Sequence, residues 1–132
     1  MRKLIPFALI IVIIAIIIIL NNNNKIDNDN TIKHVSMEDI VQIMNENTNY
    51  IILDVRTISE YNEGHIPNAI CIPNETISQD IINELPNKDQ MILVYCRSGR
   101  RSKEAAEKLK QLGYTNLIEF GGIIEWKGEI VK

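Results

Sequence analysis

The stretch "MILVYCRSGRRSKEAAEKLKQLG", residues 91–113, joins a strand pattern to a helix pattern through a short basic loop. Residues 91–95 are almost continuously apolar, which is typical of a strand that is covered on both faces. Residues 101–112 have the apolar spacing of an amphipathic helix, and Gly113 is expected to cap its C-terminus. A strand followed directly by a helix is the unit of a parallel sheet covered by helices.

The same alternation continues on both sides of this stretch. We expect further strands over residues 50–55, 69–73 and 116–120, and further helices over residues 36–47, 57–64 and 75–85. A short turn of helix is expected to end at Trp126. The sequence therefore predicts an α/β protein with three layers, in which helices cover both faces of a mainly parallel central sheet.

The N-terminus has a different composition from the rest of the chain. Arg2 and Lys3 precede seventeen residues, 4–20, without a polar or charged side chain. We interpret residues 1–20 as a transmembrane signal anchor, with a cleaved secretory signal as the alternative. Residues 21–30 contain six asparagines and are interpreted as a flexible linker. The folded domain is expected to occupy residues 31–132.

Charge predicts the location of this domain and excludes one class of partner. The two basic residues before the apolar run favour a cytoplasmic N-terminus, so the domain is expected outside the cytoplasm, anchored to the membrane or secreted. Beyond residue 20 there are seventeen acidic and twelve basic residues. A nucleic-acid partner does not fit this acidic balance.

The loop after the predicted strand at residues 91–95 has the features that activate a cysteine. Cys96 lies at the carboxyl end of that strand, where ligands bind in sheets of this kind. Gly99 allows the backbone to turn so that its N–H groups point inward, and a helix begins near Ser102. We therefore expect the pKa of Cys96 to be lowered, also by the three neighbouring arginines, Arg97, Arg100 and Arg101. A buried structural cysteine before a solvated basic turn is the alternative.

These residues resemble the single-domain rhodaneses, a sulfurtransferase family. The resemblance covers nearly all of residues 31–132 and rests on separate segments in the family's order: "LDVRTISEYNEGHIPNAICIP", "VYCRSGRRS", and "GG" followed by Trp126. Asn68 stands where the family usually has glycine. We expect this turn to be preserved, because asparagine tolerates the left-handed conformation.

The resemblance implies an activity and roles for the loop residues. Cys96 would take a sulfane sulfur from an anionic donor such as thiosulfate, become a persulfide, and pass the sulfur to a thiol, to cyanide or to a protein acceptor. Arg97 and Arg101 would hold the donor, without a metal or an organic cofactor. The binding residues that the resemblance implies are Arg97, Ser98, Gly99, Arg100, Arg101 and Ser102.

Four further residues of the resemblance are expected to support the site. Asp54 and Arg56 lie at the end of a strand, near the rim of the site. They are expected to connect neighbouring loops through ion pairs, together with Glu60. His65 is expected to stabilise a turn, because a thiolate has no proton for a general base to remove. The second cysteine, Cys71, is expected to be a buried free thiol, with a resolving partner for Cys96 as the alternative.

Two other functions are compatible with the residues. A cysteine phosphatase or arsenate reductase-like enzyme would need five residues between its cysteine and its arginine, whereas four separate Cys96 from Arg101. The second alternative is a non-catalytic, membrane-tethered rhodanese-like module that binds a partner protein. The retained Cys96 and its basic loop favour an enzyme over this module.

Overall fold

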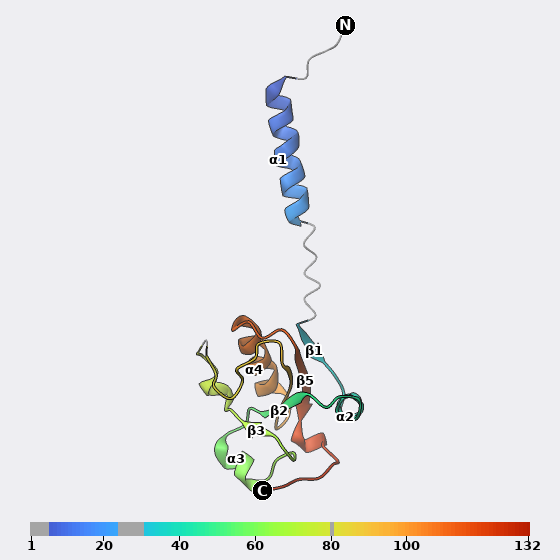
Figure 1. Cartoon of the computed structure of the whole chain (residues 1–132), viewed down its shortest axis with the longest axis vertical. Helices are drawn as coiled ribbons and strands as arrows, with labels where there is room; N and C mark the ends of the chain where they lie inside the picture. Colours follow the sequence, from blue (N-terminus) through green and yellow to red (C-terminus); the bar gives the residue numbers. More distant parts are fainter. Residues whose placement is uncertain (1–5, 24–30, 80) are drawn as a thin grey trace.

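The structure is a computed structural model that describes residues 6–23, 31–79 and 81–132. Figure 1 shows the course of the chain from α1 to the C-terminus. The helices are α1 (Phe7–Asn23), α2 (Met37–Glu46), α3 (Ile58–Glu63) and α4 (Arg100–Gln111). The strands are β1 (Ile32–His34), β2 (Tyr50–Asp54), β3 (Ile70–Cys71), β4 (Met91–Cys96) and β5 (Leu117–Gly122). Two short 3₁₀ helices are η1 (Asn74–Thr76) and η2 (Ile123–Glu125).

The five strands form one sheet in the order β1-β5-β4-β2-β3, and every pair in it is parallel. β4 lies in the middle, between β5 and β2, and all of its residues except Met91 are buried. The predicted α/β class and the parallel sheet are confirmed. β1 was not predicted, because this three-residue strand contains Lys33 and His34 and has no apolar run.

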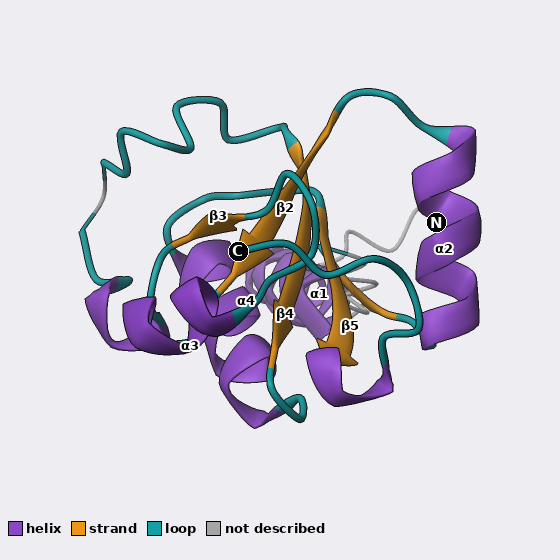
Figure 2. Ribbon diagram, turned by 90° about the horizontal axis from the view of Figure 1, so that it is seen from below, coloured by secondary structure: helices purple, strands orange, loops and turns teal. Residues whose placement is uncertain are grey.

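A separate hydrophobic core covers each face of the sheet. One core joins Val94 and Leu117 to Ala105 and Leu109 of α4. The other joins Leu93 and Ile118 to Ile40 of α2. Figure 2 shows α4 and α2 on opposite sides of the strands. Alternate residues of β4 and β5 thus enter different cores, and so a nearly continuous apolar run is required in each strand.

Side-chain caps determine where two of the predicted helices begin. The Ser36 hydroxyl accepts a hydrogen bond from the Asp39 N–H at 3.1 Å, at the start of α2. Thr57 and Glu60 form a reciprocal capping box at the start of α3. Both helix starts are confirmed. The turn before β3 is also preserved, because Asn68 adopts a φ of 65°.

The helix predicted over residues 75–85 is wrong. In the described part of this segment, only the short η1 turn is helical. Ile77 and Leu85 are buried, but Ile81, which would lie on the same helix face, is 78% exposed. The segment is rich in β-branched residues, which have low helix propensity. An irregular chain buries two of its apolar side chains without a helix.

α1 contains most of the apolar N-terminal run, and its large side chains from Phe7 to Ile19 are exposed. The helix starts after Pro6, which has no N–H, and it ends in three asparagines. Within the described residues, no helix is both long enough and apolar enough to cross a membrane. The predicted transmembrane helix is therefore not supported. Residues 1–5, and residues 24–30 of the predicted linker, lie outside the described part of the chain.

Candidate active site

Cys96 is the last residue of β4, at the carboxyl edge of the sheet. The loop to α4 is shorter than predicted, because the helix begins at Arg100 rather than near Ser102. Gly99 is the N-cap of the helix and has a φ of 114°, which a residue with a side chain rarely adopts. Arg100 and Arg101 therefore belong to the first turn of α4.

Cys96 is 1% exposed, and its sulfur faces the N-terminus of α4. The Gly99 N–H donates a hydrogen bond to Sγ over 3.0 Å, and Ser102 Oγ lies 3.5 Å from Sγ. The first-turn amides of a helix have no intrahelical acceptor, and the helix dipole places partial positive charge there. This arrangement stabilises negative charge on the sulfur, or on an atom attached to it.

The end of β5 packs directly against the cysteine loop. A Cβ atom added to Gly122 would lie 1.9 Å from the carbonyl oxygen of Arg97 and 2.6 Å from Cα of Ser98. Gly121 has a φ of 89° and lies 3.6 Å from the position of a Cβ on Gly99. Two segments that are distant in sequence thus fix the shape of the loop through the absence of side chains.

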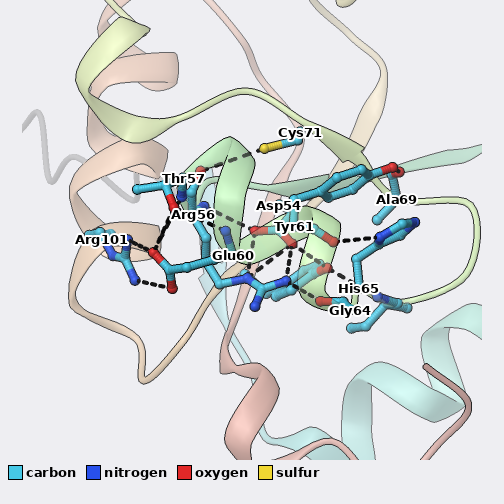
Figure 3. A network of polar contacts seen from close by, with 12 residues as sticks. Asp54, Arg56, Thr57, Glu60, Tyr61, Gly64, His65, Ala69, Cys71 and Arg101 are labelled. Atoms are coloured by element: carbon cyan, nitrogen blue, oxygen red, sulfur yellow. Dashed lines mark hydrogen bonds and ion pairs between the residues drawn. The ribbon is translucent and has the colours of Figure 1, made fainter. Parts of the chain in front are cut away.

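The arginines predicted around the sulfur differ in their partners. Arg101 forms two hydrogen bonds with the carboxylate of Glu60, at 2.7 and 3.0 Å, as Figure 3 shows. Arg100 pairs with Glu104 on the exposed face of α4. Arg97 is exposed, and within the described residues its guanidinium has no hydrogen-bond or ion-pair partner. Arg97 is therefore available to bind an anion.

The Glu60–Arg101 pair links α3 to α4 at the rim of the site. The hydrogen bonds from Arg101 lower the pKa of Glu60 to about 2. In return, the hydrogen bond to Glu60 raises the pKa of Arg101. Glu60 was expected to join Asp54 and Arg56, and the structure assigns it this different partner.

Asp54 and Arg56 form a buried pair of their own. Arg56 donates to Asp54 at 2.7 Å and to the carbonyl oxygen of Gly64 at 2.7 Å (Figure 3). The Tyr95 hydroxyl also donates to Asp54, at 2.7 Å, and accepts from the Ile66 N–H at 3.2 Å. Burial is the main reason that the pKa of Tyr95 is raised. The network ties β2, β4 and the turn after α3 together.

His65 lies in the same turn and contacts Tyr61 and Val131. Its Nδ1 lies 2.9 Å from the carbonyl oxygen of Tyr61, and its ring stacks on the Tyr61 ring at 3.7 Å. Its backbone forms a bridge with Val131 near the C-terminus. These contacts are those of a turn-stabilising residue.

Cys71 is half-buried and free, as Cys96 is free. Burial raises the pKa of Cys71 to about 11, with a smaller contribution from Asp54. In the sheet, Cys71 pairs with Asp54, which pairs with Tyr95, so these three side chains share one face. Cys96 follows Tyr95 and points to the other face. A disulfide between the two cysteines is incompatible with this register.

Two polar residues near the sulfur were not predicted. Glu119 in β5 is 2% exposed, and its Oε1 accepts a hydrogen bond from Ser102 Oγ at 2.5 Å. The second is His34 in β1, whose Nδ1 lies 2.9 Å from Oε2 of Glu119. The sequence did contain a signal for Glu119, because it is the single charged residue inside the apolar strand "LIEF", and a buried charge needs a partner.

A groove of about 280 Å³ lies beside the cysteine loop. Its lining residues come from the segment after β2, from α3 and its C-cap, from the cysteine loop and from η2: Arg56, Glu60, Glu63, Gly64, Arg97, Ile123 and Ile124. A larger cavity of about 370 Å³ is lined by Tyr50, Ile66 and Trp126, among others, and by no residue of the cysteine loop. We take the smaller groove as the approach to Cys96, because Arg97 lines it. Within the described residues, no cluster of side chains could hold a metal ion.

Comparison with known proteins agrees with this fold. The sequence model of the rhodanese-like domain matches residues 36–129, and the chain belongs to this family. A sulfurtransferase of Allochromatium vinosum is 34% identical over 96 residues, which cover 72% of this chain and 88% of that protein. The thiosulfate sulfurtransferase PspE of Escherichia coli is 37% identical over 71 residues, covering 54% of this chain and 68% of PspE.

Other relatives are longer proteins or solved structures. The putative sulfur carrier protein YrkF of Bacillus subtilis is 35% identical over 104 residues, and the chain spans about half (55%) of its length. A structure titled as a rhodanese with anions from Escherichia coli has a TM-score of 0.58 and 34% identity, covering 63% of this chain and 98% of that one. A rhodanese-like domain protein of Staphylococcus aureus has a TM-score of 0.63 and 33% identity, with coverages of 74% and 93%.

Proposed function

We propose that this protein is a sulfurtransferase that uses Cys96 as a persulfide carrier. The thiolate attacks the outer sulfur of an anionic donor such as thiosulfate, and sulfite leaves with the electron pair of the broken S–S bond. A thiol, cyanide or a protein acceptor then attacks the outer sulfur of the persulfide, and the Cys96 thiolate is restored. Relatives named as sulfurtransferases support a donor and an acceptor of this kind.

The observation that carries the proposal is the position of the Cys96 sulfur at the N-terminus of α4. The Gly99 N–H lies 3.0 Å from Sγ and stabilises the thiolate and the persulfide in turn. Arg97 lines the adjacent groove, and its guanidinium, which has no partner among the residues that the structure describes, can bind the anionic part of the donor. The related rhodanese structure is itself titled as containing anions.

The pairing of Arg101 argues against a phosphatase. A phosphate or arsenate bound at the cysteine needs an arginine that closes over its oxygens. Arg101 instead makes both of its hydrogen bonds to Glu60. A non-catalytic module would need neither an unpaired Arg97 nor a donor hydrogen bond to the sulfur.

The test is turnover of thiosulfate with cyanide, followed as thiocyanate, for the wild-type protein and Cys96→Ser. We expect turnover by the wild-type protein and none by the variant, while Cys71→Ser retains it. An aryl phosphate serves as the competing substrate. Hydrolysis of that substrate without thiocyanate formation would replace the proposal with the phosphatase, and inactivity on both would favour the binding module.

The proposal includes a location outside the cytoplasm, with residues 1–20 as an anchor or a cleaved signal. It is supported by the charge of Arg2 and Lys3 before the apolar run. Protease added to intact cells is expected to digest residues 31–132. Protection of these residues would contradict the location without affecting the proposed chemistry.

A further inference from the structure

A row of polar contacts leads from the Cys96 sulfur to the protein surface on a path separate from the groove. Sγ of Cys96 contacts Ser102 Oγ at 3.5 Å, and Ser102 Oγ contacts Glu119 Oε1 at 2.5 Å. The other carboxylate oxygen, Oε2, contacts Nδ1 of His34 at 2.9 Å. These residues come from β4, α4, β5 and β1, and none of them lines the groove.

Because the groups next to the sulfur are buried, a second negative charge among them is unfavourable. Cys96, Ser102 and Glu119 are at most 2% exposed, whereas the His34 side chain is 54% exposed. Loss of the thiol proton to solvent would leave a thiolate and a carboxylate bridged by one hydroxyl, almost without water. Two like charges in such a place disfavour each other.

The Ser102 hydroxyl has the contacts needed to move that proton. A hydroxyl accepts through its lone pairs and donates one hydrogen, so it can accept from the thiol and donate to the carboxylate at the same time. We propose that Glu119 is the proton acceptor for Cys96, acting through Ser102. The thiol S–H bond breaks as a new O–H bond forms on Ser102. The original Ser102 O–H bond breaks as one forms on Oε1 of Glu119.

This transfer moves charge without adding any. One negative charge leaves Glu119 and arrives at the sulfur, where the Gly99 N–H and the N-terminus of α4 stabilise it. The pKa of Arg101 is raised mainly by its hydrogen bond to Glu60, with a smaller contribution from the charge of Cys96. No group is oxidised or reduced. The proton stays on Glu119 while the sulfur carries its persulfide.

His34 is a positioning residue in this scheme. Its contact with Oε2 keeps Oε1 directed at Ser102, and the Gly121 N–H fixes Oε1 from a second side at 2.9 Å. Two titratable residues face the Glu119 carboxylate: His34 of β1 contacts it directly, and Cys96 of β4 contacts it through Ser102. The role deepens the proposed sulfurtransferase function and rests on it, since it supplies the thiolate which that chemistry uses.

The experiment is the rate of alkylation of Cys96 by iodoacetamide between pH 5 and 9, measured on the full chain. The Cys96 peptide is quantified by mass spectrometry, so that Cys71 does not contribute. Glu119→Gln keeps the shape of the side chain but cannot take the proton, and Ser102→Ala removes the bridge. At pH 7 we expect Cys96 in each variant to react at least about tenfold more slowly than in the wild-type protein. The increase of the rate with pH should also occur at higher pH. His34→Ala is expected to show a smaller loss in the same direction.

Glu104→Gln is the matched control, because it removes a carboxylate from the exposed face of α4 that does not contact the sulfur. It is expected to react at the wild-type rate. Alkylation of Glu119→Gln at the wild-type rate or faster would overturn the proposal. The carboxylate would then only disfavour the thiolate through charge repulsion. If circular dichroism shows that Glu119→Gln is unfolded, wild-type rates in both Ser102→Ala and His34→Ala would overturn it instead. Alkylation needs no sulfur donor, so its outcome is independent of whether thiosulfate is turned over.

Discussion

At the single-residue scale, the proposed anion binding depends on Arg97, because Arg100 and Arg101 already have carboxylate partners. Arg97→Ala removes the proposed charge-assisted contact to the donor and, within the described residues, no side-chain hydrogen bond or ion pair. We expect KM for thiosulfate to rise about tenfold or more, with little change in the free energy of unfolding. Steady-state kinetics with varied thiosulfate measures this effect.

Arg100→Ala is the control for Arg97→Ala, since Arg100 is an exposed neighbour that pairs with Glu104. An exposed pair of this kind contributes little. KM is therefore expected to stay near the wild-type value. Equal increases in both variants would mean that only the overall charge of the loop matters.

Glu60 makes stability depend on pH. Its pKa is about 2 in the folded protein, against an ordinary value of 4.5, because Arg101 donates hydrogen bonds to it. A lowered folded-state pKa adds stability that is complete above pH 4.5 and is lost as the pH falls towards 2. Between pH 6 and pH 3, urea unfolding should show a larger loss of unfolding free energy for the wild-type protein than for Glu60→Gln. Equal losses would contradict the assigned ion pair.

Individual residues also show where sequence reasoning ends. The left-handed Gly99 and Asn68 were predicted, because their conformations depend on local chemistry. The partners of Arg101 and Glu119 were not, because Glu60 lies 41 residues from Arg101 and His34 lies 85 residues from Glu119. Such pairs depend on the register of the sheet, and this register places distant segments side by side.

At the scale of elements, the contact between the end of β5 and the cysteine loop should be sensitive to a single methyl group. Gly122→Ala would place its Cβ 1.9 Å from the Arg97 carbonyl oxygen, so the loop must move. We expect the thiosulfate turnover to fall at least about tenfold and the unfolding free energy to fall by about 1–3 kcal/mol. Kinetics and urea unfolding measure the two effects.

Gly113→Ala is the control for Gly122→Ala. Gly113 has a φ of 96°, but a Cβ there would have nothing within 4 Å. The substitution is expected to cost about 1 kcal/mol of stability and to leave turnover unchanged. A loss of turnover as large as that of Gly122→Ala would show that general destabilisation explains both.

Helices and strands were predicted best in segments where the spacing of apolar residues fits a single periodicity. β4 and α4 agree with the prediction because the run at 91–95 and the spacing after Arg101 are unambiguous. The segment 75–85 has helical spacing too, yet tertiary packing favoured an irregular chain in which Ile81 is exposed. The three-residue β1 joins the sheet through pairing with β5, and its own sequence carries no strand pattern.

At the scale of the whole molecule, no residue of α1 belongs to either hydrophobic core of the part of the chain that the structure describes. Both hydrophobic cores are built from residues between Ile32 and Trp126. Removal of residues 1–30 is therefore expected to leave the unfolding free energy within about 0.5 kcal/mol of that of the full chain. A larger loss in urea unfolding would show that the N-terminal segment packs on the domain.

The most direct test of the persulfide at Cys96 is mass spectrometry of the full chain after incubation with thiosulfate. We expect one added sulfur atom, about 32 Da, on the peptide that contains Cys96. Cyanide should remove it, and the Cys96→Ala variant should not acquire it. A wild-type protein that gains no sulfur on Cys96, or gains one that cyanide leaves in place, would contradict the proposed sulfurtransferase.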